Sequence, residues 1–108
     1  MLKDLTRAYV AAFHARDPEA VAALMAPGFA LEDPVVVRIE GREAVMDAVR
    51  NIFAAAERFA FEARNIWQDG DTTIIEFRLT LDDKTLTGVD VIDWQDGKMM
   101  ELRAYLDV

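Results

Sequence analysis

Two aspartates and one tyrosine are the residues of this chain whose types and spacing suggest chemistry. Asp33 ends a short apolar run directly before Pro34, which removes a backbone donor and favours an extended backbone at Asp33. Asp90 lies in an alternating apolar segment, and Tyr9 lies on the apolar stripe of an expected helix. A carboxylate can move a proton as a general base, and phenol or neutral carboxyl groups can stabilise an oxyanion. Together in one apolar pocket, the three residues predict proton transfer beside a carbonyl group.

The surroundings of the two aspartates favour different protonation states. Asp90 lies between Gly88 and Ile92 on a dry strand face, where desolvation would raise the pKa of a carboxyl group. Asp33 ends its strand at the expected pocket mouth, so we expect it to be hydrated and ionised. Structural roles remain open alternatives: Asp33 as a turn residue, Tyr9 as a core tyrosine, and Asp90 as a partner of nearby backbone.

The elements that must position these residues begin with three helices. Apolar residues recur at helical spacing over 2–15, and Asp17 and Pro18 form an N-cap and first turn for a second helix that runs to about Met25. Gly41 opens the third helix. The expected buried face of this third helix comprises Val45, Ala48, Val49, Ile52, Phe53 and Ala56. The strand at 30–33 and an extended piece or hydrophobic flap at 35–39 precede it.

From Phe59 onward the hydrophobic period changes to two, which predicts strands joined by turns at 69–70, 82–84 and 96–97. Such a meander gives a largely antiparallel sheet. In the last strand, the apolar parity comprises Met100, Leu102, Ala104 and Leu106. Three helices followed by a meander predict an α+β fold, a curved sheet with the helices packed on its concave face.

A small helix-covered curved sheet can leave a pocket lined by its dry face, with Tyr9, Asp33 and Asp90 as the catalytic residues. The expected apolar lining consists of Phe13, Val49, Phe53, Phe61, Trp67, Phe77, Leu79, Ile92, Trp94, Leu102 and Leu106. The opposite face of the last strand, with Arg103 and Tyr105, is a candidate homodimer surface. We therefore expect a hydrophobic small-molecule ligand and a homodimer through the outer face of the sheet.

Length and composition exclude several function classes. The 108 residues form a single domain over 1–108, and the net charge of −8 with scattered basic residues argues against nucleic acid and anionic membranes as partners. Zero cysteines and one histidine predict no metal site. The N-terminus lacks an apolar run long enough for export or for spanning a membrane, so a cytoplasmic location is expected. No cofactor is expected.

Several segments in order along the chain resemble the bacterial Δ5-3-ketosteroid isomerases of the NTF2-like (SnoaL-like) superfamily. The segments that carry the resemblance are Tyr-Val-Ala-Ala at 9–12, Ala-Leu-Glu-Asp-Pro at 30–34, Gly-Arg-Glu at 41–43, Asp-Val-Ile-Asp at 90–93, Asp-Gly-Lys at 96–98 and Arg-Ala-Tyr at 103–105. The resemblance implies a cone of bent sheet with three helices, usually as a homodimer. Members of that family support the oxyanion tyrosine with further tyrosines. At the position of one of these, on the third helix, this chain carries Val49.

By this resemblance Asp33 is the general base, Tyr9 is the oxyanion-hole tyrosine and Asp90 is the protonated, hydrogen-bond-donating aspartate. Ketosteroid isomerase is itself the usual example of a carboxylic acid kept neutral by an apolar site. The implied activity is a cofactor-free allylic isomerisation through a dienolate. A cyclase or dehydratase that uses a single aspartate, and a non-catalytic small-molecule-binding protein, are the alternatives because this fold hosts several functions.

Overall fold

The computed structural model describes residues 1–35 and 37–107, which form three helices and six strands. In chain order these are α1 (Leu2–His14), α2 (Pro18–Ala23), β1 (Met25–Asp33), β2 (Val37–Glu40), α3 (Arg42–Ala54), β3 (Phe59–Asp69), β4 (Thr72–Leu81), β5 (Lys84–Gln95) and β6 (Lys98–Asp107). No helix among the described residues is long and apolar enough to cross a membrane.

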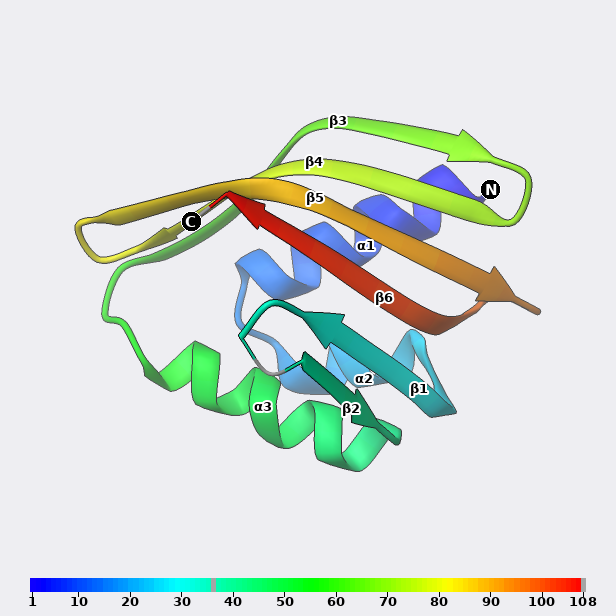
Figure 1. The fold of residues 1–108 in the computed structure, drawn as a ribbon, viewed down its shortest axis with the longest axis horizontal. Coiled ribbons are helices and arrows are strands. Elements are labelled where there is room, and N and C mark those ends of the chain that lie inside the picture. The colour runs from blue at the N-terminus through cyan, green and yellow to red at the C-terminus, as the bar shows by residue number, and fades with distance from the viewer. Residues whose placement is uncertain (36, 108) are drawn as a thin grey trace.

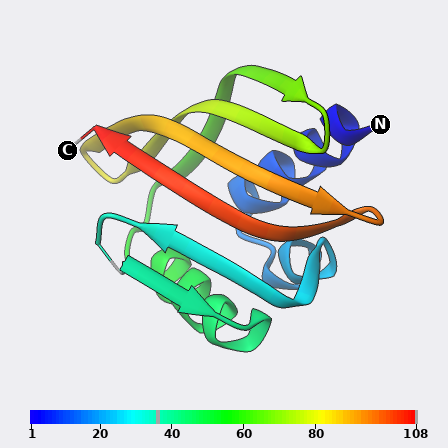
Figure 2. The same cartoon turned by 45° about the vertical axis from the view of Figure 1, so that its right-hand side comes forward.

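The six strands form one curved sheet in the order β2-β1-β6-β5-β4-β3, with all three helices on its concave side (Figure 1). Four of the five strand pairings are antiparallel, and the pairing of β1 with β6 is parallel. The predicted α+β class and largely antiparallel curved sheet are therefore confirmed, and the parallel pair makes the sheet mixed. Figure 2 shows β1 and β6 running side by side, which places the strand that ends at Asp33 next to the last strand of the chain.

Local signals explain where the helices begin and how they are held. The Asp17 carboxylate accepts a hydrogen bond from the Ala20 amide at 3.2 Å, which caps α2 as predicted. Arg16 donates to the carbonyl groups of Phe53 and Ala56 at the end of α3, at 3.1 and 2.7 Å. These bonds fix the end of α3 against the α1–α2 corner, because they satisfy carbonyls that the last helical turn leaves unpaired.

β1 begins earlier than the sequence indicates. The second helix ends at Ala23 rather than about Met25, and residues 26–28 continue β1 instead of ending a helix. Tertiary pairing overrides the local signal, since the Met99 amide donates to the Leu24 carbonyl at 2.7 Å and Met25 pairs with Met99. Of the extended piece predicted at 35–39, β2 begins at Val37, and residue 36 lies outside the described residues.

Two irregularities in strand pairing overturn predicted side-chain directions. Between Ala63 and Asn65 the β3–β4 register shifts, so Trp67 lies opposite Ile74 on the outer face and is 48% exposed. The prediction that Trp67 lines the pocket is therefore wrong, because the extra residue of a bulge reverses the alternation after it. A second shift in the β5–β6 register buries Met99 and exposes Met100, the reverse of the predicted parity.

Candidate active site

A cavity of about 430 Å³ lies between the inner face of the sheet, which faces the helices, and the helices α1 and α3. Its lining is apolar except for Tyr9, Asp33, Asp90 and Asn51. The apolar lining consists of Phe13, Met25, Phe29, Leu31, Val35, Val45, Ala48, Val49, Ile52, Phe61, Phe77, Leu79, Leu81, Leu86, Leu102, Ala104 and Leu106. No basic side chain is among these described lining residues. A predominantly apolar cavity with a few polar groups is typical of small-molecule sites.

The cavity contains most of the residues that the sequence predicts for it. The predicted lining residues found there are Phe13, Val49, Phe61, Phe77, Leu79, Leu102 and Leu106, together with Tyr9, Asp33 and Asp90. Three further predicted lining residues, Phe53, Ile92 and Trp94, are buried in the core and do not line the cavity. Trp94 instead donates from its indole nitrogen to the buried Thr73 hydroxyl at 2.8 Å.

Tyr9 on α1 and Asp90 on β5 form the deep polar part of the cavity, each with only 5% of its surface exposed. Among residues 1–35 and 37–107, neither the tyrosine hydroxyl nor the carboxyl group of Asp90 hydrogen-bonds to another protein group. No fully buried side-chain oxygen or nitrogen of the described residues lacks a partner. The Tyr9 and Asp90 oxygens must therefore be accessible from the cavity, where a ligand could supply the missing partner.

Strand register places Asp33 on the same face as Asp90. On β1, Leu31 pairs with Leu102 of β6 and Glu32 pairs with Arg103, so the next residue, Asp33, lies beside Ala104. On its other side, Ala104 pairs with Asp90 of β5. The two aspartates are thus separated by one strand, or about 10 Å between backbones. The Asp33 carboxylate also accepts a hydrogen bond from the Val35 amide at 2.7 Å, which orients it at the end of β1.

Burial and charge shift the two deep groups toward their neutral forms. Burial, and then the nearby charge of Asp33, raise the pKa of Asp90 to about 8. Burial, and then the charge of Asp90, also raise the pKa of the Tyr9 hydroxyl well above its usual value. Both groups therefore carry a proton at pH 7. This arrangement offers two hydrogen-bond donors within reach of a carboxylate.

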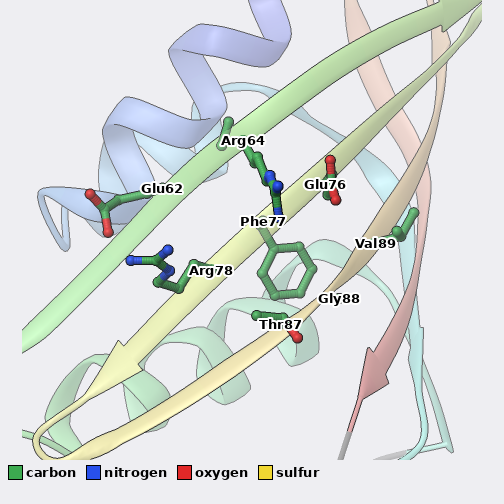
Figure 3. A pocket seen from close by; sticks show the side chains of 9 residues that line it. Glu62, Arg64, Glu76, Phe77, Arg78, Thr87, Gly88 and Val89 are labelled. Atoms are coloured by element: carbon green, nitrogen blue, oxygen red, sulfur yellow. The ribbon is translucent and has the colours of Figure 1, made fainter.

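The outer face of the sheet contains a larger hollow, of about 740 Å³, across β3, β4 and β5 (Figure 3). Its charged lining residues are Glu62, Arg64, Glu76 and Arg78. Glu62, Arg64 and Arg78 are exposed and Glu76 is half-buried, so water solvates this hollow. Although this hollow is larger, it contains no deeply buried ionisable group and is the weaker candidate for chemistry.

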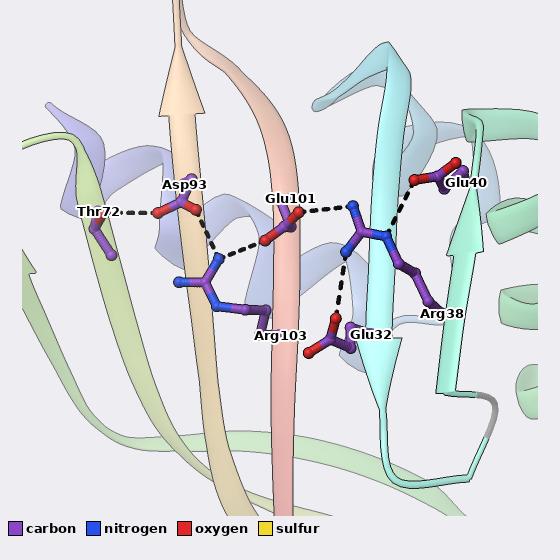
Figure 4. A network of polar contacts seen from close by, with 7 residues as sticks. All are labelled: Glu32, Arg38, Glu40, Thr72, Asp93, Glu101 and Arg103. Carbon is purple, nitrogen blue, oxygen red and sulfur yellow. Dashed lines mark hydrogen bonds and ion pairs between the residues drawn. The ribbon is translucent and has the colours of Figure 1, made fainter.

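Elsewhere on the outer face, acidic side chains are paired with arginines (Figure 4). Arg103 contacts Asp93 at 2.7 Å and Glu101 at 2.6 Å, and Arg38 contacts Glu101 at 3.0 Å. Arg38 also contacts Glu32 and Glu40, so the network extends to the edge strand β2. Each of the four acids in this network therefore contacts at least one arginine. The homodimer predicted on this face stays a prediction.

Asn51 is a lining residue that the sequence reasoning missed. It lies one turn after Ala48 on α3, at the border of the helix's buried face, and it is exposed at the open end of the cavity. Its spacing of three from Ala48 is the only signal that could have identified it. The described residues contain no group of three or more histidine, cysteine, aspartate or glutamate side chains placed to hold a metal ion.

Comparisons with known proteins agree with this architecture. A family model described as the SnoaL-like domain matches residues 6–102. The fold is similar to an NTF2-like protein of unknown function from Cytophaga hutchinsonii, with a TM-score of 0.87, 17% identity and coverage of 99% of this chain and 90% of that one. The NTF2-like cone predicted from the sequence is thereby confirmed.

Two further solved structures differ in what they say about function. A candidate ketosteroid isomerase from Kribbella flavida has a TM-score of 0.84 and 25% identity, over 97% of this chain and 76% of that one. A de novo designed protein with a curved β-sheet has a TM-score of 0.82 and 22% identity, over 97% and 84%. No curated protein sequence matches the chain. Because a designed sequence also adopts this fold, activity must be argued from the site.

Proposed function

Because the chain belongs to the SnoaL-like domain family, we propose that it is an enzyme of the ketosteroid isomerase type. The reaction would move a carbon–carbon double bond of an apolar small molecule into conjugation with its carbonyl group. Such a reaction needs a base for a carbon-bound proton and donors for the oxygen that becomes negative. Three residues of the cavity provide these functions.

In the proposed mechanism Asp33 removes a proton from the carbon next to the carbonyl group. The electron pair of that bond moves into the dienolate, and its negative charge develops on the carbonyl oxygen. Tyr9 and the neutral Asp90 donate hydrogen bonds to this oxygen. Asp33 then returns the same proton to the far end of the dienolate, which yields the conjugated ketone and restores the carboxylate. The proposed cycle uses no metal or cofactor.

The observation that carries this proposal is that Tyr9 and Asp90, two protonated donors with no protein partner among the described residues, lie in the same apolar cavity as Asp33. Tyr9 and Asp90 are almost fully buried and form no hydrogen bond within the described residues, and their oxygens are accessible from the cavity. Because burial of a polar group is costly unless it is hydrogen-bonded, a ligand oxygen at this place would be stabilised. The Tyr9 hydroxyl and the Asp90 carboxyl group donate stronger hydrogen bonds to a negatively charged oxygen than to a neutral carbonyl oxygen. They would therefore stabilise the transition state more than the substrate.

Turnover of a β,γ-unsaturated ketone, followed by the absorbance of the conjugated product, tests the proposal. Asp33→Asn should lower kcat by about 10²- to 10⁴-fold, because a positioned base typically contributes this much. Glu32→Gln is the matched control, since Glu32 is the adjacent acid and pairs with Arg38 on the outer face. Absent turnover, or equal rates for the two variants, would refute the isomerase proposal.

One feature favours a second candidate, a pocket that binds an apolar ligand without turning it over. Val49 lines the cavity, and no described residue hydrogen-bonds the Tyr9 hydroxyl to strengthen it as a donor. Binding of a phenol separates the candidates, because a phenolate imitates the dienolate oxygen. An isomerase site should lose affinity in both Tyr9→Phe and Asp90→Ala. A single-aspartate cyclase or dehydratase needs only one of these residues, and a passive binder needs neither.

A further inference from the structure

Polar groups lie at the two ends of the cavity, and the space between them is apolar apart from Asp33. Tyr9 and Asp90 belong to the deeply buried part of the lining, as do Met25, Phe29 and Val45, each no more than 2% exposed. Asn51 lines the cavity and is exposed, so it lies where the cavity borders solvent, and its side-chain amide forms no hydrogen bond within the described residues. A ligand that satisfies both ends has an apolar body with an oxygen at the inner end and a second polar group at the outer end.

The floor between the two aspartates is the small side chain of Ala104. Ala104 pairs with Asp90 on β5 and lies next to Asp33 on β1, on the inner face. The neighbouring inner positions of β6 are Leu102 and Leu106. The methyl group of Ala104 therefore leaves free the space that a larger side chain would occupy between Asp33 and Asp90.

The volume of the cavity limits the size of the ligand. A dry apolar cavity of roughly 150 Å³ holds one benzene ring, so at the same packing a cavity of about 430 Å³ holds roughly 17 non-hydrogen atoms. This is enough for two or three fused six-membered rings with a carbonyl group. A four-ring steroid ketone with its methyl groups would leave roughly three of its non-hydrogen atoms outside the cavity at that packing.

We propose that the substrate is a flat, apolar ketone of two or three fused rings, which binds oxygen first, lies over Ala104 and places a second polar group beside Asn51. The inference rests on the proposed function, because it takes Tyr9 and Asp90 as the groups that bind the oxygen. Ala104 and Asn51 are then specificity-determining residues: Ala104 sets the space for the rings, and Asn51 recognises the outer end.

Fluorescence titration with phenol, a naphthol, a phenanthrol and a chrysenol tests the size limit without requiring turnover. Each added ring should lower Kd at least about tenfold up to the three-ring phenanthrol, since each buries several further carbons. The four-ring chrysenol should bind no more tightly than the phenanthrol, because its last ring extends into water. A chrysenol that binds tenfold more tightly would overturn the inference.

Two variants test the assigned residues. Ala104→Leu should weaken phenanthrol binding at least about tenfold by filling the floor, whereas Ala54→Leu, the same change at an exposed position of α3, should change it less than about twofold. A second hydroxyl at the far end of the phenanthrol should improve binding about two- to tenfold, and Asn51→Leu should abolish that gain. Equal effects of the two leucine variants, or a gain that persists without Asn51, would contradict the assignment.

The binding series and the turnover assay can fail separately. If the phenols bind in the expected order but no ketone is isomerised, the proposed function is wrong and the ligand class stands. If ketones are isomerised and the four-ring phenol binds most tightly, the function stands and the size limit is wrong. Absence of saturable binding by every phenol would overturn the ligand class together with the Tyr9–Asp90 oxygen site.

Discussion

The two faces of the sheet treat the same kind of side chain in opposite ways. Asp90 and Asp93 are three residues apart on β5 and point to the inner and outer face respectively. Burial and the charge of Asp33 raise the pKa of Asp90 to about 8. Partial burial would also raise the pKa of Asp93, but hydrogen bonds from Arg103 and Thr72 outweigh it and lower that pKa.

The difference lies in where the basic residues are placed. Arg38 and Arg103 both lie on the outer face and form ion pairs with four of its acids, whereas no described lining residue of the cavity is basic. A paired acid such as Asp93 is held in one charge state over the neutral pH range. An unpaired acid in an apolar cavity holds a proton that it can share with a ligand. The absence of arginine among the described lining residues of the cavity is therefore the more informative feature for function.

The largest expected effect is a difference in kcat between variants of Asp90 and Asp93. Under the proposed mechanism, Asp90→Ala should lower kcat by about 10²- to 10³-fold, because it would remove one preorganised donor to the oxyanion. Asp93→Ala should leave kcat nearly unchanged, since Asp93 only contacts Arg103 and Thr72. The measurement is kcat for the same unsaturated ketone at pH 7. Similar losses in both variants would show that the face of the sheet does not matter.

The pH dependence of the free energy of unfolding should also distinguish Asp90 from Asp93. An unfolded chain loses the Asp90 proton near pH 4, whereas the folded protein keeps it to about pH 8 and so binds more protons between these values. Between these pH values, the titration of Asp90 therefore lowers the free energy of unfolding by about 1.4 kcal/mol for each unit by which the pH rises.

Urea unfolding at pH 5, 6 and 7 measures this slope. Asp90→Asn should gain stability over the wild type as the pH rises. Asp93→Asn should show no such gain, because its native pKa is lowered and its stabilising contribution is lost only as the pH falls below the ordinary range of aspartate. A constant difference between wild type and Asp90→Asn would mean that Asp90 is ionised in the folded protein.

The two tryptophans give a smaller contrast. Trp94→Phe removes a buried hydrogen bond to Thr73 and should cost about 1–3 kcal/mol of unfolding free energy. Trp67→Phe changes a side chain that is 48% exposed on the outer face and should stay within about 0.5 kcal/mol. Urea midpoints at constant m-value compare the two. A larger cost at Trp67 would place that side chain in a buried environment.

The smallest expected effect concerns the outer ion pairs. Arg103→Leu should cost about 1 kcal/mol or less at low salt, because its partners are partly solvated. The cost should shrink as salt is added, since salt screens partly exposed charges. Arg50→Leu, which breaks an exposed pair with Asp47, is the control and should have no measurable effect. A cost that does not depend on salt would point to lost packing of the Arg103 stem.

Local patterns in the sequence predicted the helices, the hairpins and the inner positions of Asp33 and Asp90, because each depends on near neighbours. The direction of Trp67 could not be predicted, since it depends on a bulge that inserts Arg64 between paired residues. The early start of β1 depends on a contact with Met99, more than 70 positions away. Asn51 was missed because an exposed polar residue at a helix border has no distinctive pattern.

The parallel pairing of β1 with β6 has a consequence for how the protein matures. The strand β1, which ends at Asp33, is synthesised well before β6, the strand that separates it from Asp90. A nascent chain that lacks β6 has no ladder to set the spacing between Asp33 and Asp90. The spacing of Asp33 and Asp90 should therefore be set only after β6 has paired with β1 and β5, and such long-range contacts are slow to form.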